Sequence, residues 1–168
     1  MPPCDLFSRP WLAASAACFS DFFGLNCLTP ALPIFLRAWA STVPTREDAI
    51  DWARTWTGLI LTFQSCAKIP GHLLWGVLSG KYGGRTILLL VMTLNVIAFA
   101  ASAIFAINGL PLGSVAFLLV IRLFAGFSAP VVPGFVYLFE RQEPGPELVA
   151  SIGKIGGGIL LGLTLGAV

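Results

Sequence analysis

The chain alternates between five long apolar runs and short connections rich in polar residues, glycine and proline, with the runs at about 11–36, 56–78, 86–107, 114–139 and 148–168. Each run has the length of about 20 residues that a helix needs to cross a hydrocarbon core of about 30 Å. All are apolar at odd and even positions alike, whereas strands of a membrane barrel alternate. Helices also pair every backbone group within the segment. The pattern predicts an all-α polytopic membrane protein with about five transmembrane helices.

Composition supports the membrane prediction and excludes several other classes. Of the 168 residues, 57% are hydrophobic and 11% are charged, against about 25% charged in soluble domains. The chain has one His, no G-x-S-x-G sequence, no phosphate-binding loop and no C-x-x-C pair. We therefore expect no enzyme, no cofactor, no metal site and no nucleic-acid partner. The expected partners are the lipid bilayer and a small-molecule substrate.

The basic residues of the connections favour a cytoplasmic N-terminus, since Lys and Arg gather on the inner side of a membrane. In that orientation the inner side has four cations and the outer side three, and the tight loop with Lys81 and Arg85 contributes most. The sequence thus predicts a multi-pass integral membrane protein and leaves plasma and organelle membranes equally open. The inner cations are Arg9, Lys81, Arg85 and Arg141, and the outer ones are Arg37, Arg46 and Arg54.

The second and third runs are joined by the sequence G-V-L-S-G-K-Y-G-G-R at 76–85. It resembles the signature G-x-L-a-D-r-x-G-r-[KR] between helices 2 and 3 of the major facilitator superfamily. Gly80 stands where that family has Asp, a residue that takes part in its inner-gate charge network. The resemblance implies an inner-loop gating motif formed by Gly76, Lys81, Gly83 and Arg85.

The fourth run contains L-L-V-I-R-L-F-A-G-F-S-A at 118–129, which is similar to the helix 4 signature R-x-x-q-G-x-g-a of the same family. Arg122 and Gly126 occupy the matching positions. An arginine this deep in a membrane costs at least about 2.5–3.5 kcal/mol, so it needs an aqueous cavity or a carboxylate nearby. A role in the solute pathway and a structural ion pair both stay open.

The fifth run is rich in glycine, and Gly153, Gly162 and Gly166 have the spacing of the family's helix 5 antiporter signature, with Ala167 in place of its proline. Gly158, Gly162 and Gly166 also form a small-xxx-small face that allows helices to approach closely. Antiporter function and helix packing alone are both compatible with the pattern. Packing is also the role expected of Gly126.

Two charged residues lie near the expected midplane of the membrane. Asp21 is about 15 Å from the inner end of its run, and Lys68 is about 18 Å from the outer end of the next. Because helices 1 and 4 of the resembled family line a central cavity, Asp21 can meet Lys68, Arg122 or both. Our hypothesis is that Asp21 is the titrating group of a proton-coupled cycle, and a permanent ion pair is the alternative.

Two further polar residues lie one helical turn from Lys68. Gln64 comes before it and His72 after it, so the three can share a stripe on one helix face. A histidine titrates near neutral pH, which makes His72 a candidate for the proton pathway. A packing role is the competing interpretation of this lone histidine.

The formal net charge of +2 is located inside the apolar runs. Outside them, seven Lys and Arg balance seven Asp and Glu, which leaves three cations and one acid inside. Either further carboxylates come from elsewhere in the protein, or the cavity receives an anionic substrate. The residues inside are Lys68, Arg122, Lys154 and Asp21, and all four are candidates for the proton or substrate pathway.

The resemblance implies a fold that normally has twelve helices in two halves of six, with the solute bound between the halves. Residues 1–168 are expected to be a truncated N-terminal domain holding helices 1–5 of the first half. The expected function is that of the N-terminal part of a secondary active transporter of a small solute, of proton-coupled antiporter type. The missing C-terminal half or a second chain is the expected partner. A non-transporting membrane scaffold or partner subunit is the alternative.

Overall fold

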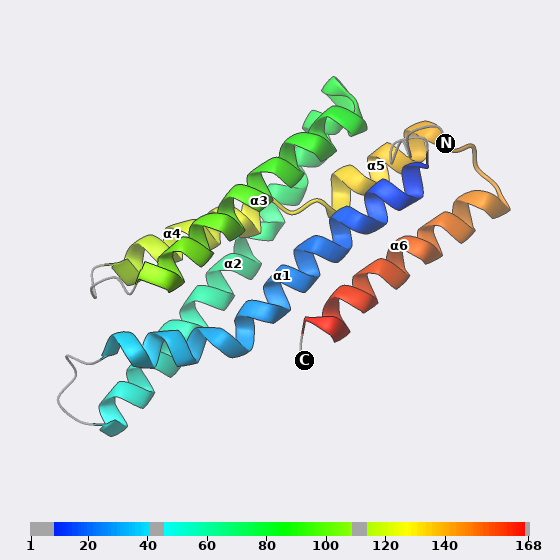
Figure 1. The fold of residues 1–168 in the computed structure, drawn as a ribbon. Helices are drawn as coiled ribbons and strands as arrows, with labels where there is room; N and C mark the ends of the chain where they lie inside the picture. Colours follow the sequence, from blue (N-terminus) through cyan, green and yellow to red (C-terminus); the bar gives the residue numbers. More distant parts are fainter. Residues whose placement is uncertain (1–8, 41–45, 109–113, 167–168) are drawn as a thin grey trace.

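Six helices form the described part of the chain, which comprises residues 9–40, 46–108 and 114–166 of a computed structural model. The long helices run up and down along one bundle (Figure 1). The start of α1, the α2–α3 junction and the α5–α6 connection therefore share one end, here called the N-terminal end. The elements are α1 (Pro10–Trp39), α2 (Arg46–Tyr82), α3 (Gly84–Asn108), α4 (Ser114–Phe127), α5 (Val131–Arg141) and α6 (Pro146–Leu165). The all-α membrane fold expected from the sequence is confirmed.

The run expected as one helix over 114–139 is divided into α4 and α5 by residues 128–130. Proline disfavours the helical conformation of the residue before it, and Pro130 follows Ala129 at this point. Pro30 and Pro33 have a milder effect, since both lie inside α1. Figure 1 shows that α1 bends over its last third, as proline inside a helix causes. Hydropathy alone does not distinguish a proline that ends a helix from one that only bends it.

The second helix is longer and more polar than the apolar run from which it was expected. α2 comprises 37 residues from Arg46 to Tyr82, and only Gly83, with φ of 87°, separates it from α3. Within the described residues, four helical segments are long and apolar enough to span a membrane, at 10–37, 84–104, 115–141 and 146–165. α2 is not among them because Gln64, Lys68 and His72 interrupt its apolar stretch. Its polar face is instead packed against the other helices.

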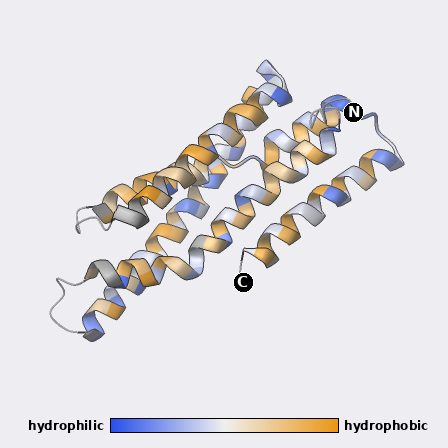
Figure 2. Ribbon diagram, viewed as in Figure 1, coloured by the Kyte–Doolittle hydropathy of each residue, from blue (hydrophilic) through white to orange (hydrophobic). Residues whose placement is uncertain are grey.

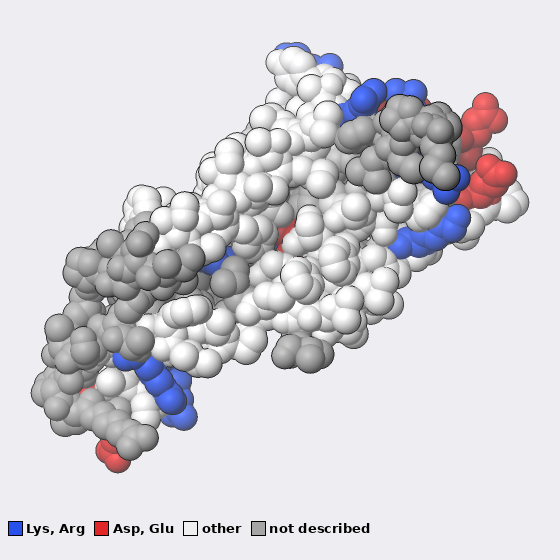
Figure 3. Space-filling model, in the orientation of Figure 1, with Lys and Arg blue, Asp and Glu red and all other residues white. Residues whose placement is uncertain are grey.

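The outer surface of the bundle is apolar between two charged ends. Figure 2 shows predominantly hydrophobic residues along the helices and hydrophilic ones at several helix ends. In Figure 3 the charged side chains gather at the two ends, and only one small blue and one small red patch interrupt the white band between them. Such a band contacts the lipid bilayer. Its large exposed side chains include Ile34, Leu73, Val77, Val96, Ile104, Val120 and Leu160.

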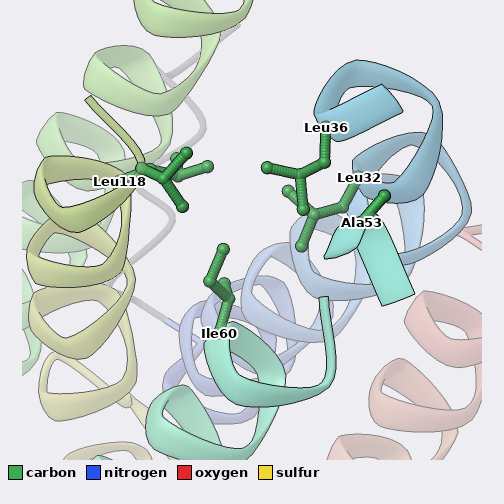
Figure 4. Close-up of a cluster of buried hydrophobic side chains, with 6 residues drawn as sticks. Leu32, Leu36, Ala53, Ile60 and Leu118 are labelled. Carbon is green, nitrogen blue, oxygen red and sulfur yellow. The ribbon is translucent and has the colours of Figure 1, made fainter. Parts of the chain in front are cut away.

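The helices pack mainly in two pairs, α1 with α6 and α2 with α4. At the end of the bundle opposite the N-terminus, a buried cluster joins α1, α2 and α4. Figure 4 shows its side chains pointing toward one another. These apolar contacts hold the three helices together near the start of α2, before its polar residues Gln64, Lys68 and His72. The labelled members are Leu32, Leu36, Ala53, Ile60 and Leu118.

Candidate functional site

A buried ion pair joins α1 and α2. The ammonium group of Lys68 donates a hydrogen bond of 2.8 Å to Oδ2 of Asp21. Asp21 is fully buried, and 17% of the Lys68 side chain is exposed. The same ammonium group lies 4.9 Å from the centre of the Phe22 ring. Asp21 is about 16 Å along α1 from its first residue, so the pair lies well inside the apolar band.

The polar groups around this pair are left without partners among the described residues. These groups are Oδ1 of Asp21, both polar side-chain atoms of Gln64 and Nδ1 of His72. Gln64 and His72 lie one turn on either side of Lys68, as the sequence spacing requires. Buried polar atoms nearly always have hydrogen-bond partners. The stripe on α2 is therefore suited to bind a proton, water or a polar solute.

Arg122 is buried in a different position. It is 3% exposed, and its guanidinium carbon lies 5.6 Å from the centre of the Phe99 ring. No described residue forms a salt bridge with it, and the carboxylate of Asp21 pairs with Lys68 instead. A Cβ atom built at Gly24 would lie 2.6 Å from the Phe99 ring, so this ring occupies the space beside α1. Of the two cations expected near Asp21, the structure brings only Lys68 to it.

Lys154 lies apart from the other residues expected in the pathway. Its side chain is exposed, and its ammonium group lies 4.5 Å from the centre of the Trp11 ring near the start of α1. Ser15 donates a hydrogen bond of 3.2 Å to the Lys154 carbonyl oxygen. Within the described residues Lys154 is thus a surface residue of the α1–α6 contact, apart from the ion pair, and its expected place in the proton or substrate pathway stays a prediction.

Glycines bring the backbones of α2 and α4 into contact close to the ion pair. A Cβ atom at Gly126 would collide with the backbone carbonyl of Gln64, and one at Gly71 would collide with the carbonyl of Phe127. On α2 the contacts involve Gln64 and Gly71, which are seven residues apart on one helix face, on either side of Lys68. This close approach positions the polar stripe of α2 against α4.

Three glycines of α6 form the same kind of contact with α1. Cβ atoms at Gly158, Gly162 and Gly166 would lie 2.9, 2.7 and 2.7 Å from the carbonyl oxygens of Ser15, Phe19 and Phe23, respectively. Both series repeat every four residues and match the face expected from the spacing. Gly153 is different, because a Cβ there would have nothing within 4 Å. Gly153 thus makes no close contact with another described helix.

At the N-terminal end, the loop motif surrounds the start of α3. Gly76 faces Val132 of α5, and Gly83 supplies the positive φ of the turn. Lys81 and Arg85 are exposed at this end, and the Lys81 ammonium lies 5.4 Å from the centre of the Tyr82 ring. The carboxylate of Glu140 accepts hydrogen bonds of 2.8 and 2.9 Å from the backbone N–H of Gly84.

Two residues that close this region, Glu140 and Trp75, were not predicted from the sequence. Glu140, near the end of α5, caps the first turn of α3. The sequence feature that could have indicated this cap is an acidic residue near the end of an apolar run. The indole nitrogen of Trp75 donates a hydrogen bond of 2.7 Å to the carbonyl oxygen of Phe127. That carbonyl ends α4, and the two rings are packed edge to face, 5.6 Å apart. No sequence signal identified it, since the break in the fourth run was not expected.

These features define a multi-pass helical membrane protein with a buried ion pair on its first two helices. Residues 14–168 match the sequence profile of the Major Facilitator Superfamily. The chain therefore belongs to this superfamily of membrane transporters, which confirms the resemblance based on the three motifs. The comparison with curated proteins found no match, and neither did the comparison with solved structures.

Proposed function

We propose that this chain takes part in proton-coupled transport of a small solute, with Asp21 as the group that binds and releases the proton. The observation that supports the proposal most is the 2.8 Å contact between Lys68 and a fully buried Asp21. A buried carboxylate that is released from its cation partner can take up a proton and become neutral, which leaves the Lys68 ammonium unpaired. Lys68 would then be available to the solute or to water.

The polar stripe of α2 supports a path to this carboxylate. His72 and Gln64 lie on either side of Lys68 and contain polar atoms without described partners. A neutral imidazole both donates and accepts hydrogen bonds, so His72 can transfer a proton to Asp21 from the N-terminal side. We assign that side to the cytoplasm, because Arg9, Lys81, Arg85 and Arg141 are found there.

The proposed cycle also includes a second set of helices, on this chain or on another. Solutes in this superfamily bind between two helical halves near the midplane of the membrane. The depth of Asp21 and Lys68 agrees with that location. In the antiporter form of the proposal, a proton is exchanged for the solute across this interface. The glycine contacts between α1 and α6 are explained by helix packing alone and do not require antiport.

Solute uptake by proteoliposomes that contain this chain together with its second set of helices tests the proposal. A panel of small cationic, neutral and anionic solutes is offered with and without an imposed pH gradient. We expect gradient-stimulated uptake of at least one class, its loss in Asp21→Asn, and its retention in Asp51→Asn, which changes an exposed acid on α2. Gradient-stimulated uptake by Asp21→Asn would overturn the role of Asp21, and a membrane scaffold would give no uptake of any solute.

A further inference from the structure

Arg122 is a buried cation that has an aromatic partner but no described anionic one. Its residue is 3% exposed, and its guanidinium lies over the ring of Phe99 at 5.6 Å. None of the salt bridges in the described residues includes it. A charge removed from water requires an opposite charge and hydrogen bonds to compensate its lost hydration. An aromatic ring supplies only part of that compensation.

The sequence contains no further acid that could neutralise Arg122. The chain has eight Asp and Glu residues, and the one inside the apolar runs, Asp21, is paired with Lys68. The partly buried Lys68, the buried Arg122 and the buried carboxylate of Asp21 leave a single positive charge in the interior. The other seven acids lie outside the apolar runs, at Asp5, Glu47, Asp48, Asp51, Glu140, Glu143 and Glu147.

Phe99 separates Arg122 from the ion pair. Its ring packs against Gly24, which lies three residues after Asp21 on the same side of α1. The guanidinium lies over this ring, and the Asp21 carboxylate pairs with Lys68 instead. A guanidinium binds carboxylates through two parallel hydrogen bonds.

Two further buried residues with unpaired polar groups, Gln64 on α2 and Asn95 on α3, belong to helix segments that adjoin Arg122 and Phe99. The backbone of Gln64 touches Gly126, which is one turn after Arg122 on α4. Gln64 is 1% exposed, and neither of its side-chain polar atoms has a described partner. Asn95, one turn before Phe99, is 3% exposed, and its Oδ1 has no described partner either. A polar ligand at this place would satisfy groups that the described chain leaves open.

We propose that Arg122 and Phe99 bind the negative charge of a small monocarboxylate solute, with the Gln64 amide as an additional hydrogen-bond donor. This inference rests on the proposed transport function and names its substrate class. One negative charge neutralises the interior, and a carboxylate fits the guanidinium plane. Arg122 is buried by this chain alone, with 3% of its surface exposed. Further helices that pack on the outside of the chain therefore cannot contact it. A small solute needs only a brief separation of α3 and α4 to reach it.

Thermal unfolding of the purified chain in detergent tests the site without requiring transport. Acetate is the probe, and acetamide is its neutral counterpart of nearly the same shape. At ten times its dissociation constant, acetate should raise the Tm by about 3–6 °C, as binding to the folded state alone requires for a chain of this size. Acetamide at equal concentration and ionic strength should not raise it. An absent acetate effect, or an equal acetamide effect, overturns the proposal.

Variants distinguish a ligand site from a structural role of Arg122. Arg122→Gln should abolish the acetate effect and unfold without acetate at the wild-type Tm or higher, because it removes an unpaired buried charge. Arg122→Lys should keep a smaller effect, and Arg54→Gln, which changes an exposed cation, should keep the full effect. Loss of stability in Arg122→Gln, or an acetate effect that persists in it, contradicts the proposal. Acetate binding without gradient-stimulated uptake would overturn the transport proposal but not the anion site. Gradient-stimulated uptake without acetate binding would overturn the anion site but not the transport proposal.

Discussion

Lys68 donates a 2.8 Å hydrogen bond to Oδ2 of Asp21, while Oδ1 of the same carboxylate has no described partner. The acid is thus held by one cation and keeps an open position. A permanently ionised structural pair gains most when all its lone pairs are satisfied. The half-satisfied arrangement instead suits a carboxylate that alternates between a cation and a proton, and this distinction underlies the transport proposal.

The contribution of the pair to stability can be measured with a double-mutant cycle on Asp21 and Lys68. Asp21→Asn leaves the Lys68 ammonium without its anion, and we expect a loss of about 3–5 kcal/mol in the free energy of unfolding. The double variant Asp21→Asn/Lys68→Gln should recover most of that loss, because no charge then remains unpaired. Denaturation of all variants in the same detergent gives the coupling energy. Additive effects of the two substitutions would contradict a direct interaction.

The backbone contact between α2 and α4 predicts opposite effects for two glycines. Gly126→Ala places a methyl group against the Gln64 carbonyl, so we expect a loss of about 1–3 kcal/mol from the forced separation of the helices. Gly58→Ala, on α2 with nothing within 4 Å of the new Cβ, should stabilise the chain by up to about 1 kcal/mol through helix propensity. Thermal unfolding compares the two. Equal effects would show that the close contact is not maintained in the membrane protein.

The hydrogen bond from Trp75 should stabilise the end of α4. Trp75→Phe keeps an aromatic ring but removes the indole N–H, which leaves the Phe127 carbonyl without this donor. The expected loss is about 1–3 kcal/mol. Trp56→Phe is the control, because the structure shows its ring in an aromatic contact with Trp52. A loss no greater than that of the control would contradict the role of the indole donor.

Capping by Glu140 should hold the start of α3 at the N-terminal end. Glu140→Gln removes the negative charge beside the first backbone N–H groups of α3, and caps of this kind contribute about 0.5–2 kcal/mol. Hydrogen exchange of the first turn of α3 should accelerate in this variant. Glu143→Gln, in the exposed α5–α6 connection, serves as the control. Unchanged exchange in Glu140→Gln would show that the cap contributes nothing.

The membrane class and the superfamily could be predicted because they depend on long-range averages and short motifs. Runs of more than about 20 apolar residues predict helices through the physics of backbone pairing in lipid. The spacing of Gly158, Gly162 and Gly166 likewise predicts one helix face, whichever helix covers it. The partner of that face, α1, could not be read from the spacing itself.

The neighbours of individual side chains depend on helix rotation and on single breaks, which hydropathy does not encode. Asp21 had two cations within reach by depth, and the ring of Phe99 decides between them by filling the space beside Gly24. Lys154 was grouped with the pathway by its place in an apolar run, yet it faces Trp11 at the surface. The fourth run is divided into α4 and α5 because Pro130 restricts the backbone of the residue before it. The mean hydropathy of the run does not reveal this restriction.

The central claim is that Asp21 takes up a proton, and infrared difference spectroscopy of the purified chain measures this directly. When the pH is lowered, the account predicts the carbonyl stretching band of a protonated carboxylic acid that is present in the wild type, persists in Glu140→Gln and is missing in Asp21→Asn. A spectrum in which Asp21→Asn removes no such band over the range where the chain stays folded would show a permanently ionised pair and contradict the account.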